Sequence, residues 1–534
     1  MSREQGPRIR PNIIVFIADQ LRADHLGAYG NTEVRTPNID RLAESSMVYN
    51  QAHVANPTCM PNRASLLTGR WPSSHGTQYN GIPVNPDAST FVRQLAGCGY
   101  RTAAVGKLHH QNMGWDFEPE QRVQIHDSAP GLLDPRLPDA VEPTREPGWD
   151  QWENRARHER EFVELPKDYY GYQDVDLVIG HGDAPGGHWL HWARERGIDP
   201  LTLGGAANGS NVLHSWEQVY TSSIPAQLHP TSYIGQQAEH RVREAAENDD
   251  PFFLFVSFPD PHHPFAPPRE YAQRYDPQQL SLPVGFEQNH ERSPEHIRRM
   301  HEVRGTPNAD LTMTFAVSEE QYRAAAAAQY GLIEYMDEQI GRVLQALEET
   351  GQTENTVVVF TSDHGDLFGD HGLMLKHFVH YRAVTRVPLM IHVPGSAGQR
   401  SDELVSSADF APTVMDLADV PSFRGIQGRS LAVDGQLSAT AGSASLLIEE
   451  DQPFALDGLP APVRMRTVIT AEGRLTRYMG TEITELYDHR SDPDELLNVA
   501  GTVHAEALQR RLEAELTEQL VHLATARSRP TAAA

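Results

Sequence analysis

Three apolar runs that each end in polar residues constrain the fold of this chain more than any other feature. They cover residues 11–20, 251–257 and 356–364. A continuous apolar run without polar alternation is typical of a strand that is buried on both faces, as in a parallel sheet covered by helices. The polar residues then lie at the carboxyl ends of the strands, where open α/β sheets bind their ligands.

The chain also carries the pattern of a long amphipathic helix between the last two runs. Residues 318–321 form a Ser-Glu-Glu-Gln capping box, and apolar positions continue from Tyr322 to Leu347 before Gly351 ends the pattern. Strands that alternate with helices predict an α/β fold, with a large, mostly parallel mixed sheet flanked by helices.

A chain of 534 residues is too long for one ordinary core, so we expect a second, smaller unit. We predict a catalytic α/β domain over residues 1–435 and a C-terminal α+β subdomain, with an antiparallel sheet and a helix, over 436–534. Its short strand patterns lie at 445–448, 466–470 and 486–487, its charged helix pattern at 505–524, and a tail predicted to be disordered at 527–534.

Residues 112–225 have a different composition from the rest of the first domain. They are rich in Pro, Gly, Trp and Asp and show little sustained periodicity. Long segments of this kind inside a compact domain are usually functional loops, so we predict an elaborated loop region or lid over the site.

The charge of the chain narrows the class of partner. The formal net charge of −27 argues against nucleic acid, because a phosphate backbone needs a basic surface. An anionic substrate must then be drawn in by a local positive site. Of the 45 Lys and Arg residues only three are lysines, Lys107, Lys167 and Lys376, so each lysine is a candidate for specific chemistry.

The sequence also bears on location. The longest apolar run near the start, residues 13–18, is far too short to span a bilayer, and no basic leader with an apolar stretch and a cleavage site precedes it. Two cysteines cannot form a disulfide framework, which fits a reducing compartment. We expect a cytoplasmic protein with no membrane partner, and the oligomeric state stays open, a homo-oligomer included.

Cys59 opens the most informative motif of the chain. It begins the run Cys-Met-Pro-Asn-Arg, which ends at Arg63 and is followed by Ala-Ser-Leu-Leu-Thr-Gly-Arg. Cys-x-Pro-x-Arg alone would arise by chance in about one of a hundred chains of this composition. A lone cysteine beside a turn proline is most often a structural core residue, but the extended match argues against coincidence.

This run resembles the signature of the formylglycine-dependent sulfatases of the alkaline phosphatase superfamily, Cys-x-Pro-x-Arg followed by Ala-Ser-x-x-Thr-Gly-Arg. The resemblance implies that a formylglycine-generating enzyme oxidises Cys59 to an aldehyde, whose hydrate is the nucleophile. A geminal diol has one oxygen to attack the sulfur and a second whose deprotonation expels the trapped sulfate, whereas a serine would remain as a stable sulfate ester.

Polar pairs that follow the first and last apolar runs are candidate metal ligands. Asp19-Gln20 and Asp363-His364 each stand at a predicted strand end, and two carboxylates brought together there need a cation to coexist. Oxygen ligands with one amide and one imidazole suit Ca²⁺ or Mg²⁺, with Mn²⁺ also open. The sulfatase resemblance implies the same four residues, with the modified Cys59 as fifth ligand and Ca²⁺ as the first choice.

Two lysines fall in further segments that resemble the family. Gly-Lys-Leu-His at residues 106–109 is similar to the Gly-Lys-x-His segment, which implies that Lys107 binds a sulfate oxygen and that His109 is the base for sulfate release. Residues 372–376 resemble Gly-Leu-x-x-Lys, which makes Lys376 the second sulfate ligand. The signature itself implies that Arg63 holds the diol oxygen.

A histidine pair is the candidate for the leaving-group acid. Residues 258–265 resemble the segment that protonates the leaving alcohol oxygen, and His262 fits best, with His263 as the alternative. The resemblance continues to a Leu-Tyr-Asp run at 486–488 and Asn498, so it covers nearly the whole chain except 112–225. That segment is therefore expected to set substrate choice.

Three functions remain after this reading. The first is a sulfuric ester hydrolase, arylsulfatase-like, acting on a small anionic ester. The second is a phosphonate monoester hydrolase or phosphodiesterase, which uses the same nucleophile and metal ligands; the Gly-Lys-Leu-His segment favours the first. The third, a non-catalytic member with Cys59 never oxidised, is disfavoured because every expected site position is filled. The alcohol, whether aryl, sugar or a small alkyl such as choline, stays open.

Overall fold

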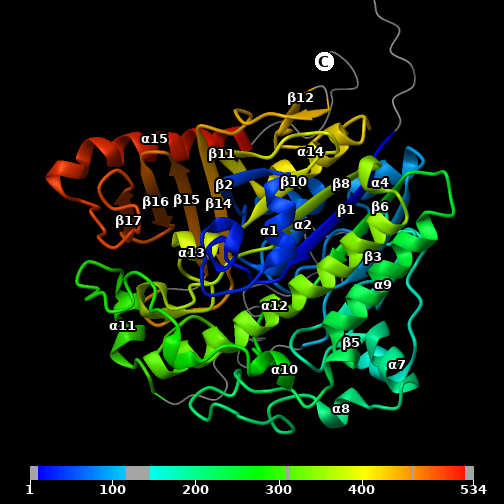
Figure 1. Ribbon diagram of the computed structural model, residues 1–534. Coiled ribbons are helices and arrows are strands. Elements are labelled where there is room, and N and C mark those ends of the chain that lie inside the picture. The colour runs from blue at the N-terminus through cyan, green and yellow to red at the C-terminus, as the bar shows by residue number, and fades with distance from the viewer. Residues whose placement is uncertain (1–9, 116–144, 307–311, 434, 460–461, 524–534) are drawn as a thin grey trace, which may run out of the picture.

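A computed structural model describes residues 10–115, 145–306, 312–433, 435–459 and 462–523 (Figure 1). A nine-stranded sheet is at its centre, in the order β11-β2-β10-β8-β1-β6-β3-β4-β5. The strands are β1 (Asn12–Ala18), β2 (Met47–His53), β3 (Arg101–Gly106), β4 (Asp174–Ile179), β5 (Gly186–Gly187), β6 (Phe252–Ser257), β8 (Thr356–Ser362), β10 (Leu389–His392) and β11 (Gln399–Ser406).

The middle of this sheet is parallel. β1 lies between β8 and β6 and pairs with both in parallel, and β3 and β4 continue the parallel order. β10 runs antiparallel to β8 and β2, so the sheet is mixed. The three strands predicted from the apolar runs are therefore adjacent, and their carboxyl ends meet at one edge.

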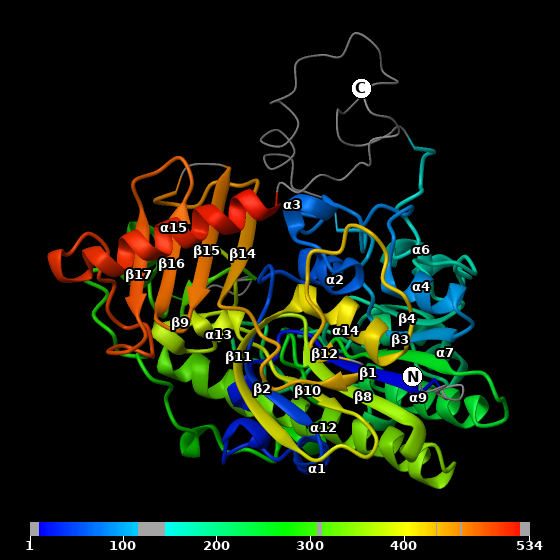
Figure 2. The ribbon, with the colours of Figure 1, turned by 90° about the horizontal axis from the view of Figure 1, so that it is seen from above.

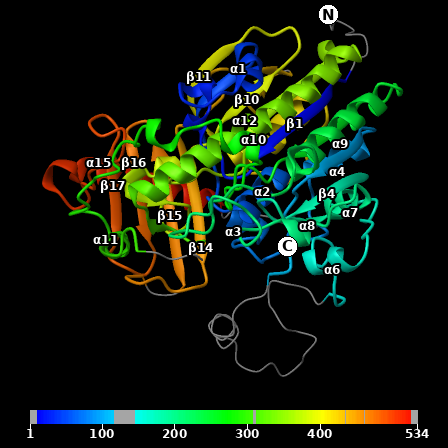
Figure 3. The same cartoon turned by 60° about the horizontal axis from the view of Figure 1, so that its bottom comes forward.

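Helices cover both faces of the sheet (Figure 2). Alternate side chains of β1 enter two different cores, Ile14 and Phe16 on one face and Ile13 and Val15 on the other. The first face is covered by α1 (Pro37–Glu44), α7 (His188–Glu195), α9 (Pro230–Ala245) and α12 (Glu319–Glu349), and the second by α2 (Cys59–Thr68), α4 (Phe91–Gly97) and α14 (Phe410–Leu417). Figure 3 shows α12 and α9 side by side across the first face.

The long helix α12 begins where its capping box predicts. The side chain of Ser318 accepts a hydrogen bond from the backbone N–H of Gln321, and the Gln321 side chain accepts from the backbone N–H of Ser318. The reciprocal bonds satisfy two backbone donors at the helix start. The predicted α/β fold with a mostly parallel mixed sheet is confirmed.

A second, antiparallel sheet lies near the C-terminus (Figure 1, orange). It consists of β14 (Ser445–Gln452), β15 (Val463–Thr470), β16 (Gly473–Tyr478) and β17 (Thr484–Asp488), and α15 (Glu506–Leu523) packs on it. Leu508, Leu512 and Leu516 of the helix are buried against Leu447, Val468, Leu475 and Leu486 of the sheet. The α+β class predicted for this region is confirmed, the boundary at 435 stays a prediction, and the predicted disordered tail lies outside the described residues.

Residues 112–225 differ from the predicted loop region. Their described part contributes β4 and β5 to the central sheet together with α6 (Arg155–Arg160), α7 and α8 (Pro200–Leu203). β4 is short and begins with charged residues, because it stands near the sheet edge, so it lacks the apolar run by which the inner strands are recognised. Residues 116–144 of this segment lie outside the described part.

The remaining elements are short. They are α3 (Pro72–His75), α10 (Arg269–Ala272), α11 (Glu295–Glu302), α13 (Arg382–Thr385), β7 (Phe315–Ala316), β9 (Leu373–Met374), β12 (Ala432–Val433) and β13 (Gln436–Leu437). Within the described residues, no helix combines the length and apolarity needed to cross a bilayer.

Candidate active site

Cys59 is the first residue of α2 and is buried. It follows Thr58, the extended N-cap residue of the helix, and its Sγ lies near Asp19 and His364, which follow β1 and β8. Its Sγ lies 3.1 Å from Nε2 of His364, 3.2 Å from Nζ of Lys376 and 3.8 Å from Oδ1 of Asp19. The cysteine therefore stands at the centre of the predicted site residues.

Arg63, one helical turn after Cys59, connects three strand ends. Its Nε donates to Oδ2 of Asp363 at 2.7 Å, and one of its terminal nitrogens donates to the backbone carbonyl of Lys107 at 2.8 Å and to Oγ of Ser257 at 2.9 Å. The ends of β8, β3 and β6 are thus held by one buried guanidinium.

Asp19 and Gln20 follow β1 directly. Gln20 adopts a left-handed backbone (φ 64°), and its N–H donates to Oδ1 of Asp363 at 3.1 Å. Asp19 is fully buried and forms an ion pair with Lys107. Burial raises the pKa of Asp19, but the positive charges of Lys107 and Arg63 outweigh it and hold the pKa well below its ordinary value.

Lys376 is buried and contacts four polar atoms. Its Nζ lies 2.8 Å from Oε1 of Gln20, 2.8 Å from Nε2 of His364, 3.1 Å from Nε2 of His262 and 3.2 Å from Sγ of Cys59. None of these atoms is a carboxylate oxygen. A buried ammonium without an acidic partner is costly unless an anion binds beside it.

The two candidate acids follow β6 and lie side by side. The rings of His262 and His263 stack with centroids 4.1 Å apart. His262 directs Nε2 at Lys376, whereas Nδ1 of His263 lies 3.2 Å from Nε2 of Gln20. Burial, the neighbouring His181 and His263, and Lys376 lower the pKa of His262 well below its ordinary value.

His109 lies at the margin of this group. Its backbone is left-handed (φ 56°), its N–H donates to Oε2 of Glu153 at 2.7 Å, and its Nδ1 is buried without a hydrogen-bond partner among the described residues. Burial and then Lys107 lower its pKa well below the ordinary value. The structure gives no hydrogen bond between His109 and Cys59 within its described part.

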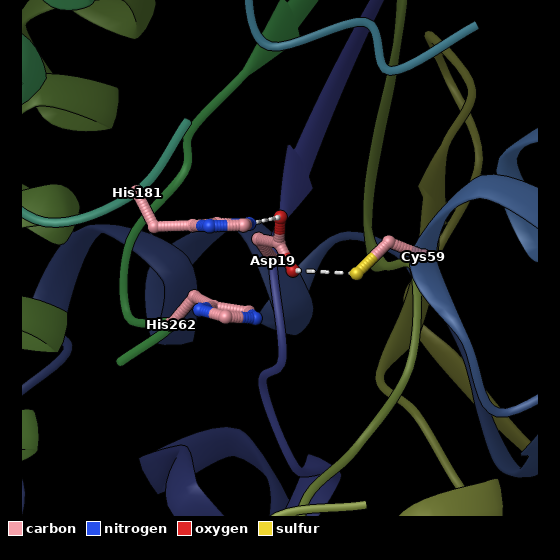
Figure 4. A group of neighbouring side chains, drawn as sticks. All are labelled: Asp19, Cys59, His181 and His262. Carbon is pink, nitrogen blue, oxygen red and sulfur yellow. Dashed lines mark hydrogen bonds and ion pairs between the residues drawn. The ribbon is translucent and has the colours of Figure 1, made fainter. Parts of the chain in front are cut away.

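His181, which the sequence analysis did not select, belongs to the same cluster (Figure 4). It lies after β4, and its Nε2 is 2.5 Å from Nζ of Lys107 and 3.6 Å from Oδ2 of Asp19. Its ring stacks on that of His262 with centroids 3.7 Å apart. One histidine among 26, in a segment without a matching motif, gave no sequence signal.

Two sets of four side chains bring ligand atoms within 4.8 Å of one another. Both contain Asp19 and Cys59; one adds Asp363 and His364, and the other His181 and His262. Imidazole binds a metal along the plane of its ring, so two rings stacked 3.7 Å apart and 11° from parallel cannot both direct their lone pairs at one ion. The set with Asp363 and His364 therefore fits an ion better.

The donor chemistry of that set fits a divalent cation. Nε2 of His364 lies 3.5 Å from Oδ1 of Asp19 and 3.6 Å from Oδ1 of Asp363, spacings that Ca²⁺ or Mg²⁺ ligands adopt. Burial and then Lys376 lower the pKa of His364 to about 4, so the imidazole is in its neutral, metal-binding form at neutral pH.

Comparison with known proteins identifies the family of the chain. A family model described as "Sulfatase" matches residues 11–125 and 193–420, and one described as "N-sulphoglucosamine sulphohydrolase, C-terminal" matches 369–522. An arylsulfatase of Clostridium perfringens is 27% identical over 95% of this chain and 92% of its own length. A choline-sulfatase of Rhizobium meliloti is 27% identical over 92% of this chain and 82% of its own.

Solved structures show the same fold. A phosphonate monoester hydrolase of Agrobacterium radiobacter superposes with a TM-score of 0.71 at 23% identity, covering 96% of both chains. The fold, the site and the relatives define an enzyme that is a sulfuric ester hydrolase. Because the family model matches more than half of its length, the chain belongs to the sulfatase family of the alkaline phosphatase superfamily.

Proposed function

We propose that this enzyme cleaves sulfate monoesters in the manner of the arylsulfatases, with a formylglycine hydrate derived from Cys59 as nucleophile and one divalent metal, Ca²⁺ first. The observation that carries the proposal is the buried ammonium of Lys376 beside Sγ of Cys59, at 3.2 Å, with no carboxylate oxygen within 4.0 Å among the described residues. This arrangement leaves a positive charge for a substrate anion at the nucleophile.

The metal site would consist of Asp19, Gln20, position 59, Asp363 and His364. When bound, the ion would offset the charge on the sulfate oxygens and orient the hydrate. Arg63, paired with Asp363 at 2.7 Å, holds one of these ligands in place, and it lies one turn from the nucleophile on the same helix.

The two lysines would bind the anion from different strand ends. Lys107 follows β3 and Lys376 follows β9, and both are buried within the cluster around Asp19 and Cys59. Ammonium groups already fixed in position stabilise charge that builds on the sulfuryl oxygens in the transition state without reorganisation.

His262 would protonate the leaving alcohol oxygen. Its Nδ1 lies against the backbone carbonyl of His263, which leaves Nε2 facing the site. A bound anion adds negative charge beside the ring and so favours its protonated form. His109 stays the proposed base for sulfate release.

A phosphonate monoester or phosphodiester is the second candidate substrate. Two lysines and one metal can bind either a sulfuryl or a phosphoryl group. The proposed metal ligands Asp19, Gln20, Asp363 and His364 therefore do not distinguish the two substrate classes. The deciding experiment compares kcat/KM of the converted, Ca²⁺-loaded enzyme on aryl esters of sulfate, phosphonate and phosphodiester that share one leaving group. A higher value for the sulfate supports the proposal, and a higher value for either phosphorus ester replaces it with the second candidate.

Three parts of the proposal concern maturation, location and assembly and not the reaction itself. Maturation requires a formylglycine-generating enzyme as partner. The expected cytoplasmic location and the oligomeric state are tested by fractionating the source cells and by light scattering of the purified protein.

A further inference from the structure

The loop that carries His181 is fitted to the segment that carries His262. Gly180 and Gly182 flank His181 with left-handed backbones (φ 103° and 66°). A Cβ on Gly182 would stand 3.2 Å from Cδ of Pro264, tighter than ordinary van der Waals contact. A side chain at position 182 would push Pro264 away by a few tenths of an ångström and would be strained at this positive φ, so glycine favours the close approach of the two segments.

A buried carboxylate anchors the same loop. Asp183, two residues after His181, accepts hydrogen bonds from the hydroxyls of Tyr220 at 2.8 Å and Ser222 at 2.5 Å and from the backbone N–H of Gly205 at 2.9 Å. Three donors to one buried carboxylate fix the backbone beside it. The position of His181 is therefore set before any substrate binds.

His181 touches two groups to which the proposed function gives different tasks. Its ring is stacked on the ring of His262, with 3.7 Å between centroids and 11° between planes, and its Nε2 is 2.5 Å from Nζ of Lys107 (Figure 4 shows the stacked pair beside Asp19 and Cys59). An ammonium can only donate, so the Nε2 of His181 accepts. The side chain of His181 is 17% exposed, so it lies at the open margin of a buried cluster.

We propose that His181 is a positioning residue with two separable effects. Its ring holds the plane of His262 for proton delivery to the leaving oxygen, and its Nε2 holds the ammonium of Lys107 where the anion binds. The inference rests on the proposed function, because it takes the roles of His262 and Lys107 from there. It assigns to the segment 112–225 a part in the chemistry itself.

The two contacts are separated by two substitutions. His181→Phe keeps a ring for stacking and removes the nitrogen, whereas His181→Gln keeps an acceptor for Lys107 and removes the ring. His214→Ala is the control, because His214 lies in the same segment and is exposed. Each variant is made as the converted, Ca²⁺-loaded enzyme, and its melting temperature is recorded.

The first readout is the ratio of kcat/KM for phenyl sulfate to kcat/KM for 4-nitrophenyl sulfate. Phenolate is the poorer leaving group and depends more on protonation. We expect His181→Ala and His181→Gln to lower this ratio by about three- to tenfold, which corresponds to the loss of one aromatic stacking interaction. His181→Phe should keep the ratio within about twofold of wild type, because its ring can still stack. His214→Ala should leave the ratio unchanged.

The second readout needs no turnover. Calorimetric titration with inorganic sulfate should show affinity about tenfold weaker in His181→Phe and His181→Ala, and close to wild type in His181→Gln. An unchanged ratio in His181→Ala, or unchanged sulfate affinity in His181→Phe, overturns the corresponding half of the inference.

His262→Ala separates this inference from the proposed function. If His262→Ala lowers the ratio and His181→Ala does not, the proposed function stands and the positioning role is wrong. If His262→Ala leaves the ratio unchanged, the proposed role of His262 is wrong, and the sulfate titration alone decides whether His181 holds Lys107.

Discussion

The buried cluster around Cys59 and the buried cluster around Arg474 are built on opposite principles. Around Cys59, Lys376 contacts an amide, a thiol and two imidazoles and no carboxylate. In the C-terminal sheet, Arg474 of β16 is equally buried but donates to Glu495 at 2.8 Å and to Thr476 at 2.7 Å, with Glu485 at 3.9 Å.

The different partners of Lys376 and Arg474 distinguish a cluster that serves catalysis from one that serves stability. In the Arg474 cluster the buried cation has a carboxylate partner, and Glu495 also accepts from His489 at 3.0 Å and from the backbone N–H of Arg382 at 3.0 Å. In the cluster at Cys59, Lys107 and Arg63 pair with carboxylates, but Lys376 has no carboxylate oxygen within 4.0 Å among the described residues, which costs stability until an anion binds. Removing a group from the Arg474 cluster should damage the fold, and removing one from the Cys59 cluster should damage catalysis.

The largest effect is expected at the nucleophile. Cys59→Ala should reduce turnover of an aryl sulfate to background and leave the melting temperature within a few degrees of wild type, because only one small side chain is lost. Cys59→Ser should leave at most a trace, since serine cannot release sulfate by carbonyl formation. Full activity in the alanine variant would remove the basis of the mechanism.

Metal removal should come next. Dialysis against a chelator, or Asp363→Ala, should lower kcat/KM by about 10²–10⁴-fold, which corresponds to several kcal/mol of charge stabilisation. Elemental analysis before and after dialysis gives the stoichiometry, and re-addition of Ca²⁺, Mg²⁺ or Mn²⁺ in turn identifies the ion that restores the rate. Unimpaired activity in protein free of divalent metal would contradict the assignment.

The three lysines form a set with an internal control. Lys107→Ala and Lys376→Ala should each lower kcat/KM by about 10²–10³-fold, the loss of one preorganised donor. Lys167 has a side chain that is 79% exposed and pairs with Asp174 at 3.3 Å, so Lys167→Ala should change little. Equal small effects at all three would mean that the metal and Arg63 alone hold the anion.

The stability prediction concerns the cluster around Arg474. Arg474→Met leaves Glu495 and Glu485 buried without their cation and should cost about 3–5 kcal/mol of unfolding free energy, with kcat/KM of the folded enzyme unchanged. Adding Glu495→Gln should recover part of that loss. A fall in kcat/KM without a fall in melting temperature would abolish the distinction between the clusters.

Lowering the pH also tests the contribution of the Arg474 cluster to stability. Burial raises the pKa of Glu495, but Arg474 and His489 lower it by a larger amount. The pKa in the folded state therefore lies below the unfolded value of about 4.5. A depressed carboxyl pKa contributes stability above the unfolded value that is lost as the pH falls. The melting temperature should therefore drop less steeply in Glu495→Gln than in wild type between about pH 5 and pH 3.

Much of the central sheet could be predicted because its inner strands are apolar on both faces. The runs at β1, β6 and β8 need no knowledge of their neighbours to be recognised. β16 was not predicted, because Arg474 and Arg477 interrupt its apolar positions, and the buried Arg474 is intelligible only with Glu495 beside it.

The site shows the same division between residues that the local sequence reveals and residues that only the folded chain brings together. Asp19 and Asp363 stand at strand ends that any parallel sheet brings together, and Cys59 carries a long motif, so their proximity followed from sequence. His181 reaches them only because β4 pairs with β3 and places the following loop over Asp19. Gly182 and Asp183 help to place that loop, but the local sequence does not reveal which residues it will meet.

The central claim, that converted Cys59 is the nucleophile, is tested most directly by relating turnover to conversion. Protein is produced with graded amounts of a formylglycine-generating enzyme, and mass spectrometry of the Cys59 peptide gives the fraction in which the thiol has become an aldehyde. We predict that kcat on an aryl sulfate rises in proportion to that fraction and extrapolates to zero when no Cys59 is converted. A rate that is independent of the converted fraction would contradict the account.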